Sequence, residues 1–528
     1  MSKEKLGIII SGSFVDGVVA KLSYGLDLST VAIGRFVCIK DGNDVFLSII
    51  SNLSLGSVPE SVIQNPPHED EKLFSHILNK TVLHIIAHLK PMITVHKDGK
   101  FEPVNTVPRH LSGIFQANES DVAAVFGQED EGFKNFSIGH PIGMNANVCL
   151  NLGHFTTRSN GIFGKTGTGK TFITRTILAG ITRSKCAVNL VFDMHSEYGI
   201  QARSEGKKCS FVKGLKTLFP GDVAIFSLDP EATRKRGCSP DVSVQLSYRD
   251  IRVQDVILLQ DELNLHSTAL EAAYLLGNRF GNKWLETLLD SGENLRELSE
   301  NVGAHPESIG ALYRKLKRFE HFKFLQKAPS KPPVVDMMLE YLNRGISVVL
   351  EFGRQTSMLS YLLIAGIITR RIHRAYVAKT EHFLSTQNSS DEPRKLVITI
   401  EEAHKFLNPK AARQTIFGMI AREMRKYYVS LLVVDQRPSC IDNEVLSQLG
   451  TKIVAQLSDE SDIQAVLTGV SGASSVKAIL ATLGPKKQAF VMGHAVPMPV
   501  VIQTREYDEK FYSAVSTNAT AAVKELFG

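Results

Sequence analysis

The spacing of hydrophobic and polar positions changes along the chain. Residues 5–60 contain short apolar runs, such as Gly7-Ile-Ile-Ile and Val45-Phe-Leu-Ser-Ile-Ile, separated by Gly, Asp and Asn turns. This pattern predicts short strands, and we assign residues 1–115 to an N-terminal β domain. Residues 241–335 instead contain consecutive amphipathic segments with helical spacing. That stretch is too long for a connecting loop and predicts a helical insertion.

The rest of the chain alternates continuous apolar runs with helical segments. Such runs are typical of strands that are buried on both faces of a sheet. The clearest examples begin at Asn189, Ile346, Leu396 and Val429. Strands that alternate with helices predict a parallel α/β sheet. We therefore expect an α/β core over residues 116–240 and 336–510, followed by a C-terminal tail over residues 511–528.

One glycine-rich segment carries the most specific chemistry. From Gly164 to Thr171 the sequence matches the phosphate-binding loop G-x-x-x-x-G-K-T at every fixed position. Glycines let backbone N–H groups point at phosphate oxygens, Lys170 can reach the β- and γ-phosphates, and the Thr171 hydroxyl can complete a Mg²⁺ shell. Helical spacing from Phe172 onward places the loop at a helix N-terminus, which favours anions. We expect ATP and Mg²⁺ to bind here, through Gly164, Gly167, Thr168, Gly169, Lys170, Thr171 and Phe172.

Two adjacent carboxylates follow the apolar run that begins at Leu396. In open α/β sheets ligands bind at the C-terminal ends of strands, so Glu401 is expected near the Mg²⁺. Glu402 is expected to orient and deprotonate the attacking water. Gln436, at the end of the run that begins at Val429, is placed to sense the γ-phosphate or the water. The alternative for the glutamates is a solvated pair in the first turn of a helix. The phosphate loop in the same chain favours catalysis, and the sequence predicts a nucleoside triphosphatase.

The order of these motifs resembles the HerA branch of the HerA/FtsK ATPases, which are hexameric DNA translocases. The phosphate loop is followed by D-x-H-x-E-Y from Asp193, h-E-E-A-H up to His404, R-x-x-R-K-Y from Arg422 and Q-R-P-S from Gln436. The likeness extends over about residues 136–501. It implies a RecA-like P-loop ATPase core, an N-terminal β-barrel and a homohexamer.

The resemblance also assigns further residues to the nucleotide. Arg158 corresponds to an arginine that reaches the nucleotide, and Arg425 to the finger that enters a neighbouring subunit's site. The family loop that touches nucleotide near the C-terminus maps onto the segment that begins with Gly493 and His494. From the residues alone, the arginines of 420–428 are more simply a solvated helix face. Two positions depart from the family pattern, because Glu401 replaces the usual aspartate and Asp435 stands where Ser or Thr is common.

Composition and charge restrict the possible classes of protein only a little. A chain of 528 residues is expected to form two or three domains. Its six scattered cysteines argue against a zinc ribbon or a disulfide framework and suit a reducing cytosol. No signal peptide or membrane-spanning run is evident, so we expect a cytoplasmic protein without membrane contact. The net charge of +6 permits nucleic-acid binding without demonstrating it.

Double-stranded DNA is expected to contact the loop that follows Glu402, because hydrolysis could move that loop directly. Lys410 and Arg413 are the expected phosphate contacts. The basic runs at residues 233–236 and 313–318 are second candidates, although such runs are usually solvated faces. No base-reading motif is visible, so sequence-specific recognition is disfavoured.

Two functional hypotheses follow. In the first, a hexameric motor of HerA type hydrolyses ATP and pulls DNA for a partner nuclease. In the second, the ATPase ring is an assembly platform or activator for a phage-defence effector, such as a nuclease or a sirtuin-type enzyme. Either hypothesis requires a partner, since no effector segment is found in the chain. A DNA-independent conjugation or packaging ATPase would share the core but would explain the N-terminal barrel less well.

Overall fold

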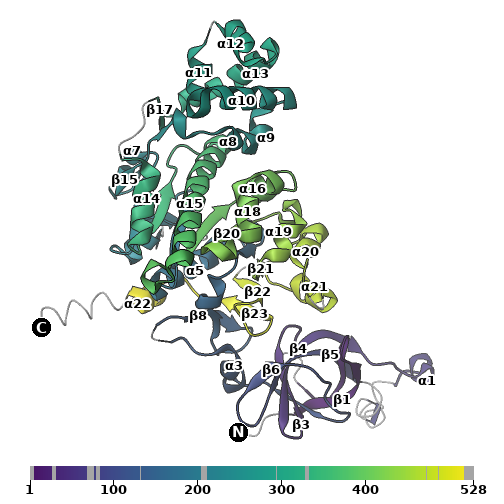
Figure 1. Ribbon diagram of the computed structural model, residues 1–528. Coiled ribbons are helices and arrows are strands. Elements are labelled where there is room, and N and C mark those ends of the chain that lie inside the picture. Colours follow the sequence, from purple (N-terminus) through teal and green to yellow (C-terminus); the bar gives the residue numbers. More distant parts are fainter. Residues whose placement is uncertain are drawn as a thin grey trace, which may run out of the picture. The chain divides into compact units, whose positions relative to one another are not determined.

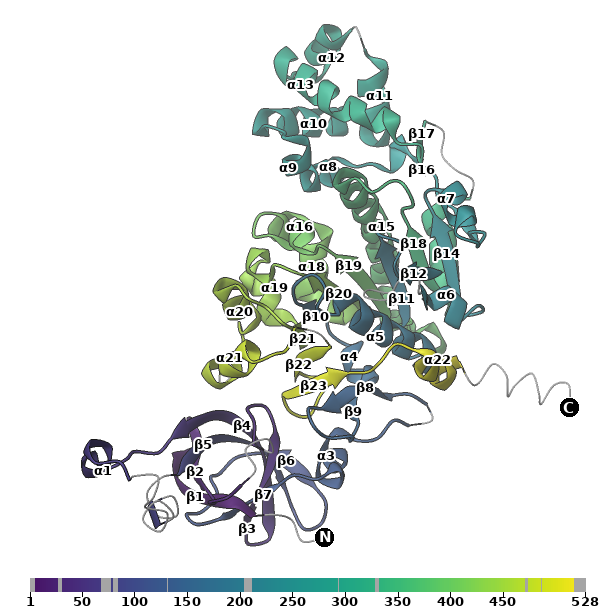
Figure 2. The same ribbon diagram turned by 180° about the vertical axis from the view of Figure 1, so that it is seen from behind.

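The computed structural model shows two compact units (Figures 1 and 2). It describes residues 5–26, 31–67, 77–78, 84–130, 132–203, 211–292, 294–327, 332–470, 473–485 and 487–516. The first unit comprises residues 1–151, 164–169 and 451–505. The second unit comprises residues 152–163, 170–450 and 506–528.

A closed β-barrel occupies the N-terminal part of the first unit (Figure 1). Its strands are β1 (Lys5–Ser13), β2 (Gly17–Leu22), β3 (Phe36–Asp41), β4 (Asp44–Leu55), β5 (Ile85–Val95), β6 (Phe101–Pro103) and β7 (Gly113–Gln116). They follow the order β2-β1-β7-β3-β4-β5-β6, and pairing of β2 with β5 closes the ring and leaves β6 outside it. Register shifts in β4 bend that long strand around the barrel. The predicted N-terminal barrel is confirmed.

Apolar side chains from alternating strand positions fill the barrel, and they include Leu6, Ile9, Val18, Ile39, Phe46 and Leu89. The same unit holds an antiparallel sheet with the order β21-β22-β23-β8-β9. Its strands are β8 (Asn135–Pro141), β9 (Val148–Asn151), β21 (Thr451–Ala455), β22 (Gln488–Gly493) and β23 (Val500–Thr504). The helices of this unit are α1 (Glu60–Gln64), α3 (Glu119–Phe126), α20 (Glu460–Val466) and α21 (Ala473–Ala481).

A parallel sheet forms the core of the second unit, with the strand order β15-β14-β18-β11-β19-β20-β10. The strands are β10 (Asn160–Phe163), β11 (Val188–Asp193), β14 (Val223–Ser227), β15 (Val242–Ser243), β18 (Ser347–Glu351), β19 (Leu396–Glu401) and β20 (Val429–Asp435). Nearly every residue in these strands is buried, as the continuous apolar runs predict. The expected P-loop ATPase core is therefore present. Because the strands are parallel, their C-terminal ends meet at one edge of the sheet.

Helices α5 (Lys170–Ser184), α6 (Leu215–Leu218), α14 (Val334–Asn343) and α18 (Ile416–Glu423) pack on these strands. The unit also contains α4 (Leu152–Phe155), α7 (Pro230–Lys235), α15 (Met358–Thr386), α16 (His404–Leu407), α17 (Ala411–Gln414), α19 (Asn443–Gln448) and α22 (Glu509–Ser516). Two small sheets pair β12 (Gln201–Arg203) with β13 (Phe211–Lys213), and β16 (Leu246–Ser247) with β17 (Leu325–Gln326). Residues 511–516 of the expected tail belong to α22, and residues 517–528 lie outside the described residues.

The predicted helical insertion gathers at one end of the second unit (Figures 1 and 2). It contains α8 (Val253–Leu258), α9 (Gln260–Leu263), α10 (Ser267–Phe280), α11 (Trp284–Asp290), α12 (Leu295–Val302) and α13 (Pro306–Leu316). Trp284 is buried and donates a hydrogen bond to the Ile251 carbonyl at 2.9 Å, so it packs the core of the insertion. A buried ion pair between Asp255 and Arg370 (2.7 Å) joins α8 to α15. The expected domain boundaries at residues 115, 240 and 335 stay predictions.

Candidate nucleotide and catalytic site

The phosphate-loop motif connects β10 to α5. Gly164, Gly167 and Gly169 have φ angles of 156°, 79° and 102°, a region that side-chain-bearing residues rarely adopt. A Cβ on Gly164 would also lie 2.8 Å from the Cβ of Ala455. The Thr168 hydroxyl donates to the Lys165 carbonyl at 2.8 Å, which closes the turn. The fixed glycines of the motif are therefore required by the backbone.

Helix α5 begins at Lys170, so Lys170, Thr171 and Phe172 form its first turn. Backbone N–H groups in a helix's first turn have no partner within the helix and attract anions. A buried arginine on the next turn, Arg175, lies over the rings of Phe172 (5.2 Å) and Tyr198 (5.9 Å). Arg175 was not predicted as a site residue, because its neighbour Tyr198 comes from a separate segment of the chain.

The D-x-H-x-E-Y motif forms a tight turn after β11. The buried Asp193 carboxylate accepts hydrogen bonds from the backbone N–H groups of Glu197, Tyr198 and Gly199, at 2.7, 2.9 and 3.1 Å. Burial raises the pKa of Asp193. These bonds fix the loop so that the Tyr198 hydroxyl donates to Glu401 Oε1 at 2.6 Å. The motif thus brings a tyrosine to the predicted metal ligand.

Glu401 and Glu402 stand at the C-terminal end of β19, as the sequence predicts. Burial raises the pKa of Glu401 to about 8, and the hydrogen bond from Tyr198 opposes this rise. The Tyr361 hydroxyl accepts from the Glu401 N–H at 3.0 Å and donates to its carbonyl at 3.2 Å. Glu402 has a left-handed φ of 48°, and its Oε1 accepts from Gln436 Nε2 at 3.1 Å. The structure therefore brings Glu402 and Gln436 together.

A second contact joins the same two strand ends and was not predicted. The Asp435 carboxylate, buried at the end of β20, accepts from the backbone N–H of His404 at 2.7 Å. His404 Nδ1 lies 3.0 Å from the same Asp435 oxygen and 3.6 Å from Glu402 Oε2. The hydrogen bond to Asp435 raises the pKa of His404. In the sequence, Asp435 stood out only as a departure from the family pattern.

The arginines assigned by resemblance lie on different elements. Arg158 precedes β10 and is half-buried, with its side chain against Gly450. Arg425 lies in a 3₁₀ turn at Met424–Tyr427, and its side chain falls outside the described part of the structure. Gly493 and His494 are exposed at the end of β22 and in the turn after it. Gly493 belongs to the first unit and has a φ of 119°.

The predicted DNA contacts follow α16. Arg413 is exposed on α17, whereas Lys410 Nζ lies 3.4 Å from Asp261 Oδ1 of the insertion. A second ion pair to the insertion joins Lys405 Nζ to Glu262 Oε1 at 3.2 Å. In the basic run 233–236, Arg236 pairs with the buried Glu351 at 2.9 Å. These ion pairs engage Lys410 and Arg236 within the protein.

Hard oxygen donors are what Mg²⁺ prefers, and it commonly keeps several waters. The Glu401 carboxylate and the Thr171 hydroxyl are donors of this kind, so the residues present fit that ion. Among the described residues, no group of three or more His, Cys, Asp or Glu side chains could hold a metal. The cysteines that the structure describes (Cys38, Cys149, Cys186, Cys238 and Cys440) are not joined in disulfides.

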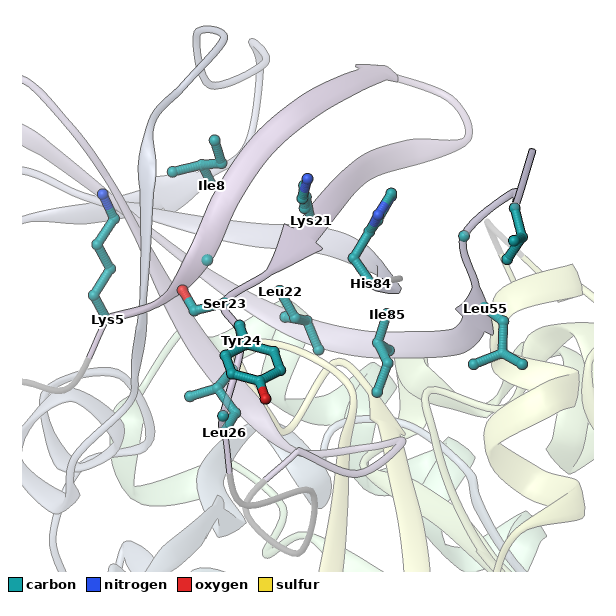
Figure 3. Close-up of a pocket in the computed structure, with 14 residues that line it drawn as sticks. Lys5, Ile8, Lys21, Leu22, Ser23, Tyr24, Leu26, Leu55, His84 and Ile85 are labelled. Carbon is teal, nitrogen blue, oxygen red and sulfur yellow. The ribbon is translucent and has the colours of Figure 1, made fainter. Parts of the chain in front are cut away.

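A separate open cavity of about 670 Å³ lies at the surface of the barrel and was not predicted (Figure 3). Its apolar lining includes Ile8, Leu22, Leu26, Leu55 and Ile85, and its polar lining includes Lys5, Lys21, Tyr24 and His84. None of the predicted site residues lines this cavity.

A family model described as "Helicase HerA, central domain" matches residues 136–372. The DNA double-strand break repair helicase HerA of Sulfolobus acidocaldarius is 23% identical over 514 residues, which cover 96% of this chain and 94% of that protein. The HerA of Saccharolobus solfataricus is 22% identical over 91% of this chain and 89% of that protein. The central part of the chain matches this family, and the likeness to HerA helicases over most of its length supports a HerA-type ATPase. This HerA-type protein is an ATP-hydrolysing P-loop enzyme.

Solved structures with a similar fold include VirB4 of Thermoanaerobacter pseudethanolicus, with a TM-score of 0.46, 13% identity, and coverage of 70% of this chain and 96% of that one. A bacterial conjugative coupling protein, TrwB, has a TM-score of 0.47 and 11% identity, and covers 74% of this chain and 92% of that one. Within the described part of this HerA-type chain, no helix is long and apolar enough to cross a bilayer.

Proposed function

We propose that this HerA-type ATPase is a DNA translocase or helicase that works as a homohexamer with a partner nuclease or effector. The observation that carries the catalytic part is the hydrogen bond between Gln436 and Glu402, which places an amide and a carboxylate at adjoining strand ends. The relatives' names support the DNA part, since several are called DNA double-strand break repair helicases.

Each residue of the site has a proposed task. The loop from Gly164 to Gly169 wraps the phosphates, and Lys170 neutralises the β- and γ-phosphate oxygens. Thr171 and Glu401 hold Mg²⁺, which, when bound, neutralises charge on the phosphates. Glu402 takes a proton from the attacking water, and Gln436 orients that water.

Residues from neighbouring subunits complete the site in this proposal. Arg425 enters the next subunit's site and stabilises charge that develops on the γ-phosphate. Arg158, Gly493 and His494 contact the nucleotide. DNA passes through the ring, where Arg413 contacts phosphates and Lys410 does so once it leaves Asp261.

The proposal is tested by ATPase assays on the purified protein with and without duplex DNA. Parent protein is expected to hydrolyse ATP faster with DNA, and Lys170→Ala is expected to lose nearly all activity. DNA affinity of the parent is expected to fall linearly with salt on logarithmic axes, and Arg413→Ala is expected to reduce that slope by about one phosphate contact, or ~0.9. Arg279→Ala, at a partly exposed arginine of α10, is the matched control.

Activity that responds to a protein partner but to no DNA at any salt would contradict the motor. That outcome would favour the assembly-platform hypothesis, in which the ATPase ring licenses an effector.

A further inference from the structure

The C-terminal ends of β19 and β20 are joined by two side-chain links. The strands run parallel, with Glu401 opposite Val434. One link is the hydrogen bond from Gln436 to Glu402 (3.1 Å), and the other is the contact of Asp435 with His404. Each link pairs a residue just after β19 with one at the end of β20 or just after it. The second link has no part in the catalytic proposal so far.

His404 is held at two points by one buried carboxylate. Its backbone N–H donates to Asp435 Oδ2 at 2.7 Å, and its ring Nδ1 lies 3.0 and 3.2 Å from the two Asp435 oxygens. Asp435 also accepts from the Arg437 N–H at 2.7 Å, and it is 1% exposed. A residue bonded through both backbone and side chain cannot turn away without breaking both contacts. Asp435 therefore fixes the ring of His404.

The fixed ring faces the Glu402 carboxylate. Nδ1 of His404 lies 3.6 Å from Glu402 Oε2, while Oε1 of the same carboxylate accepts from Gln436. One Glu402 oxygen is thus hydrogen-bonded to Gln436, and the other faces the His404 ring. The charged neighbours of the ring are Asp435, Glu402 and Lys405, and the hydrogen bond to Asp435 contributes most to its raised pKa. A protonated ring at this distance attracts the carboxylate.

Glu402 needs such support because of its backbone. Its φ of 48° lies in the left-handed region, which costs a non-glycine residue of order 1 kcal/mol or more. A residue keeps such a conformation only when its surroundings hold it there. The Glu402 carbonyl accepts from the Lys405 N–H at 2.9 Å, and the Glu402 side chain contacts Gln436 and lies beside His404.

We propose that His404, fixed by Asp435, is a positioning residue that aims the Glu402 carboxylate at the water that attacks ATP. This inference rests on the proposed role of Glu402 as the base. His404 does not touch the nucleotide in this arrangement; it acts through Glu402. A misplacement of about 1 Å in such a group can cost on the order of 100-fold in rate.

The test compares kcat and KM for ATP in His404→Ala, His404→Asn and parent protein. His404→Ala is expected to lower kcat by about 10- to 100-fold, with KM changed less than about twofold, because nucleotide binding does not involve the ring. The asparagine amide can still donate to Asp435, so His404→Asn is expected to recover part of kcat. Asp435→Asn, which keeps the side-chain shape, is expected to lower kcat as His404→Ala does.

His382→Ala is the matched control, since His382 lies beside Asp391 (3.7 Å) but is exposed on α15. Melting temperatures show whether each variant folds. Glu402→Gln tests the proposed base separately from the positioning role of His404. ATP hydrolysis at the parent rate in that variant would refute Glu402 as the base. If Glu402→Gln is inactive while His404→Ala turns over like the parent, the base stands and the positioning role is wrong. A loss of kcat with an equal rise in KM, without recovery in His404→Asn, also overturns it.

Discussion

Single side chains at strand ends decide the chemistry of this site. Tyr198 reaches Glu401 from the turn after β11, and Gln436 and His404 reach Glu402 from two sides. Groups that hold a metal ligand in place commonly affect metal affinity as much as they affect structure. These contacts give the site an organised set of oxygen atoms before nucleotide arrives.

Removing the Tyr198 hydroxyl tests this organisation. Tyr198→Phe keeps the buried ring but loses the 2.6 Å hydrogen bond to Glu401. The Mg²⁺ concentration that half-activates ATP hydrolysis is expected to rise by about 10-fold or more, because the carboxylate loses its orienting partner. Titrations of Mg²⁺ at fixed ATP measure this, with Tyr274→Phe on the exposed face of α10 as control. Identical Mg²⁺ curves for Tyr198→Phe and parent would contradict the expectation.

The sequence predicted the residues of this site unevenly for a physical reason. The phosphate loop and the Glu401–Glu402 pair are contiguous motifs whose local geometry determines their chemistry. His404–Asp435 and Arg175–Tyr198 are contacts between segments far apart in the chain, and no periodicity reports them. Asp435 was visible as an unusual residue, but its partner became evident only when the ends of β19 and β20 lay side by side.

Elements follow the hydrophobic pattern closely in both units. The continuous apolar runs became the central parallel strands, and the amphipathic segments within 241–335 became helices α8–α13, which span residues 253–316 and are flanked by the short strands β15, β16 and β17. Strand order could not be read from the pattern, since a strand buried on both faces looks alike at every place in a sheet. The barrel's closure through β2 and β5 was likewise predicted only by resemblance.

A buried ion pair contributes to the attachment of α8 to α15, beside the contacts of Asp250 with Arg370 and Arg371. Asp255→Ala would leave the Arg370 guanidinium buried without its partner, a loss of about 3–5 kcal/mol. Hydrogen exchange in α8 and the adjoining turns of α15 is expected to quicken accordingly. Asp336→Ala removes an exposed partner of Arg371 (3.2 Å) and is expected to cost less than about 1 kcal/mol. Equal exchange rates in the two variants would show that the buried pair does not hold the insertion.

A buried lysine in the first unit gives its stability a pH dependence. Lys452 Nζ donates to the Val466 and Thr468 carbonyls, and burial lowers its pKa to about 8. Above about pH 8 the unfolded chain, with a lysine pKa of about 10.4, binds more protons than the folded one, so this contribution to stability rises with pH.

Melting temperatures of parent and Lys452→Met at about pH 7.5 and about pH 9.5 test this dependence. The melting temperature of the parent, relative to that of Lys452→Met, is expected to be higher at about pH 9.5 than at about pH 7.5. Lys477→Met, at an exposed lysine of α21, is expected to show no such change. Parallel shifts for parent and Lys452→Met would contradict the assigned pKa.

At the scale of the whole molecule, the proposed ring requires that subunits share active sites. Lys170→Ala and Arg425→Ala are each expected to be nearly inactive as pure rings. Mixed rings are expected to recover part of the activity, because some interfaces then pair an intact phosphate loop with an intact finger. ATPase assays on mixtures, with native mass spectrometry to confirm mixed rings, measure this. If mixed rings form but do not recover activity, Arg425 is not the arginine that completes the neighbouring subunit's site.

The short pairing of β16 with β17 has a consequence for how this protein can vary. Leu246 lies opposite Leu325 and Ser247 opposite Gln326, so the chain leaves and re-enters the core at neighbouring points. The segment between β16 and β17 therefore begins and ends at one place, where these two short strands pair. A change in the length of this segment therefore need not change the register of the parallel sheet, and the β16–β17 pair marks the junction at which the segment could be grafted, provided that its ion pairs to Arg370, Lys405 and Lys410 are kept.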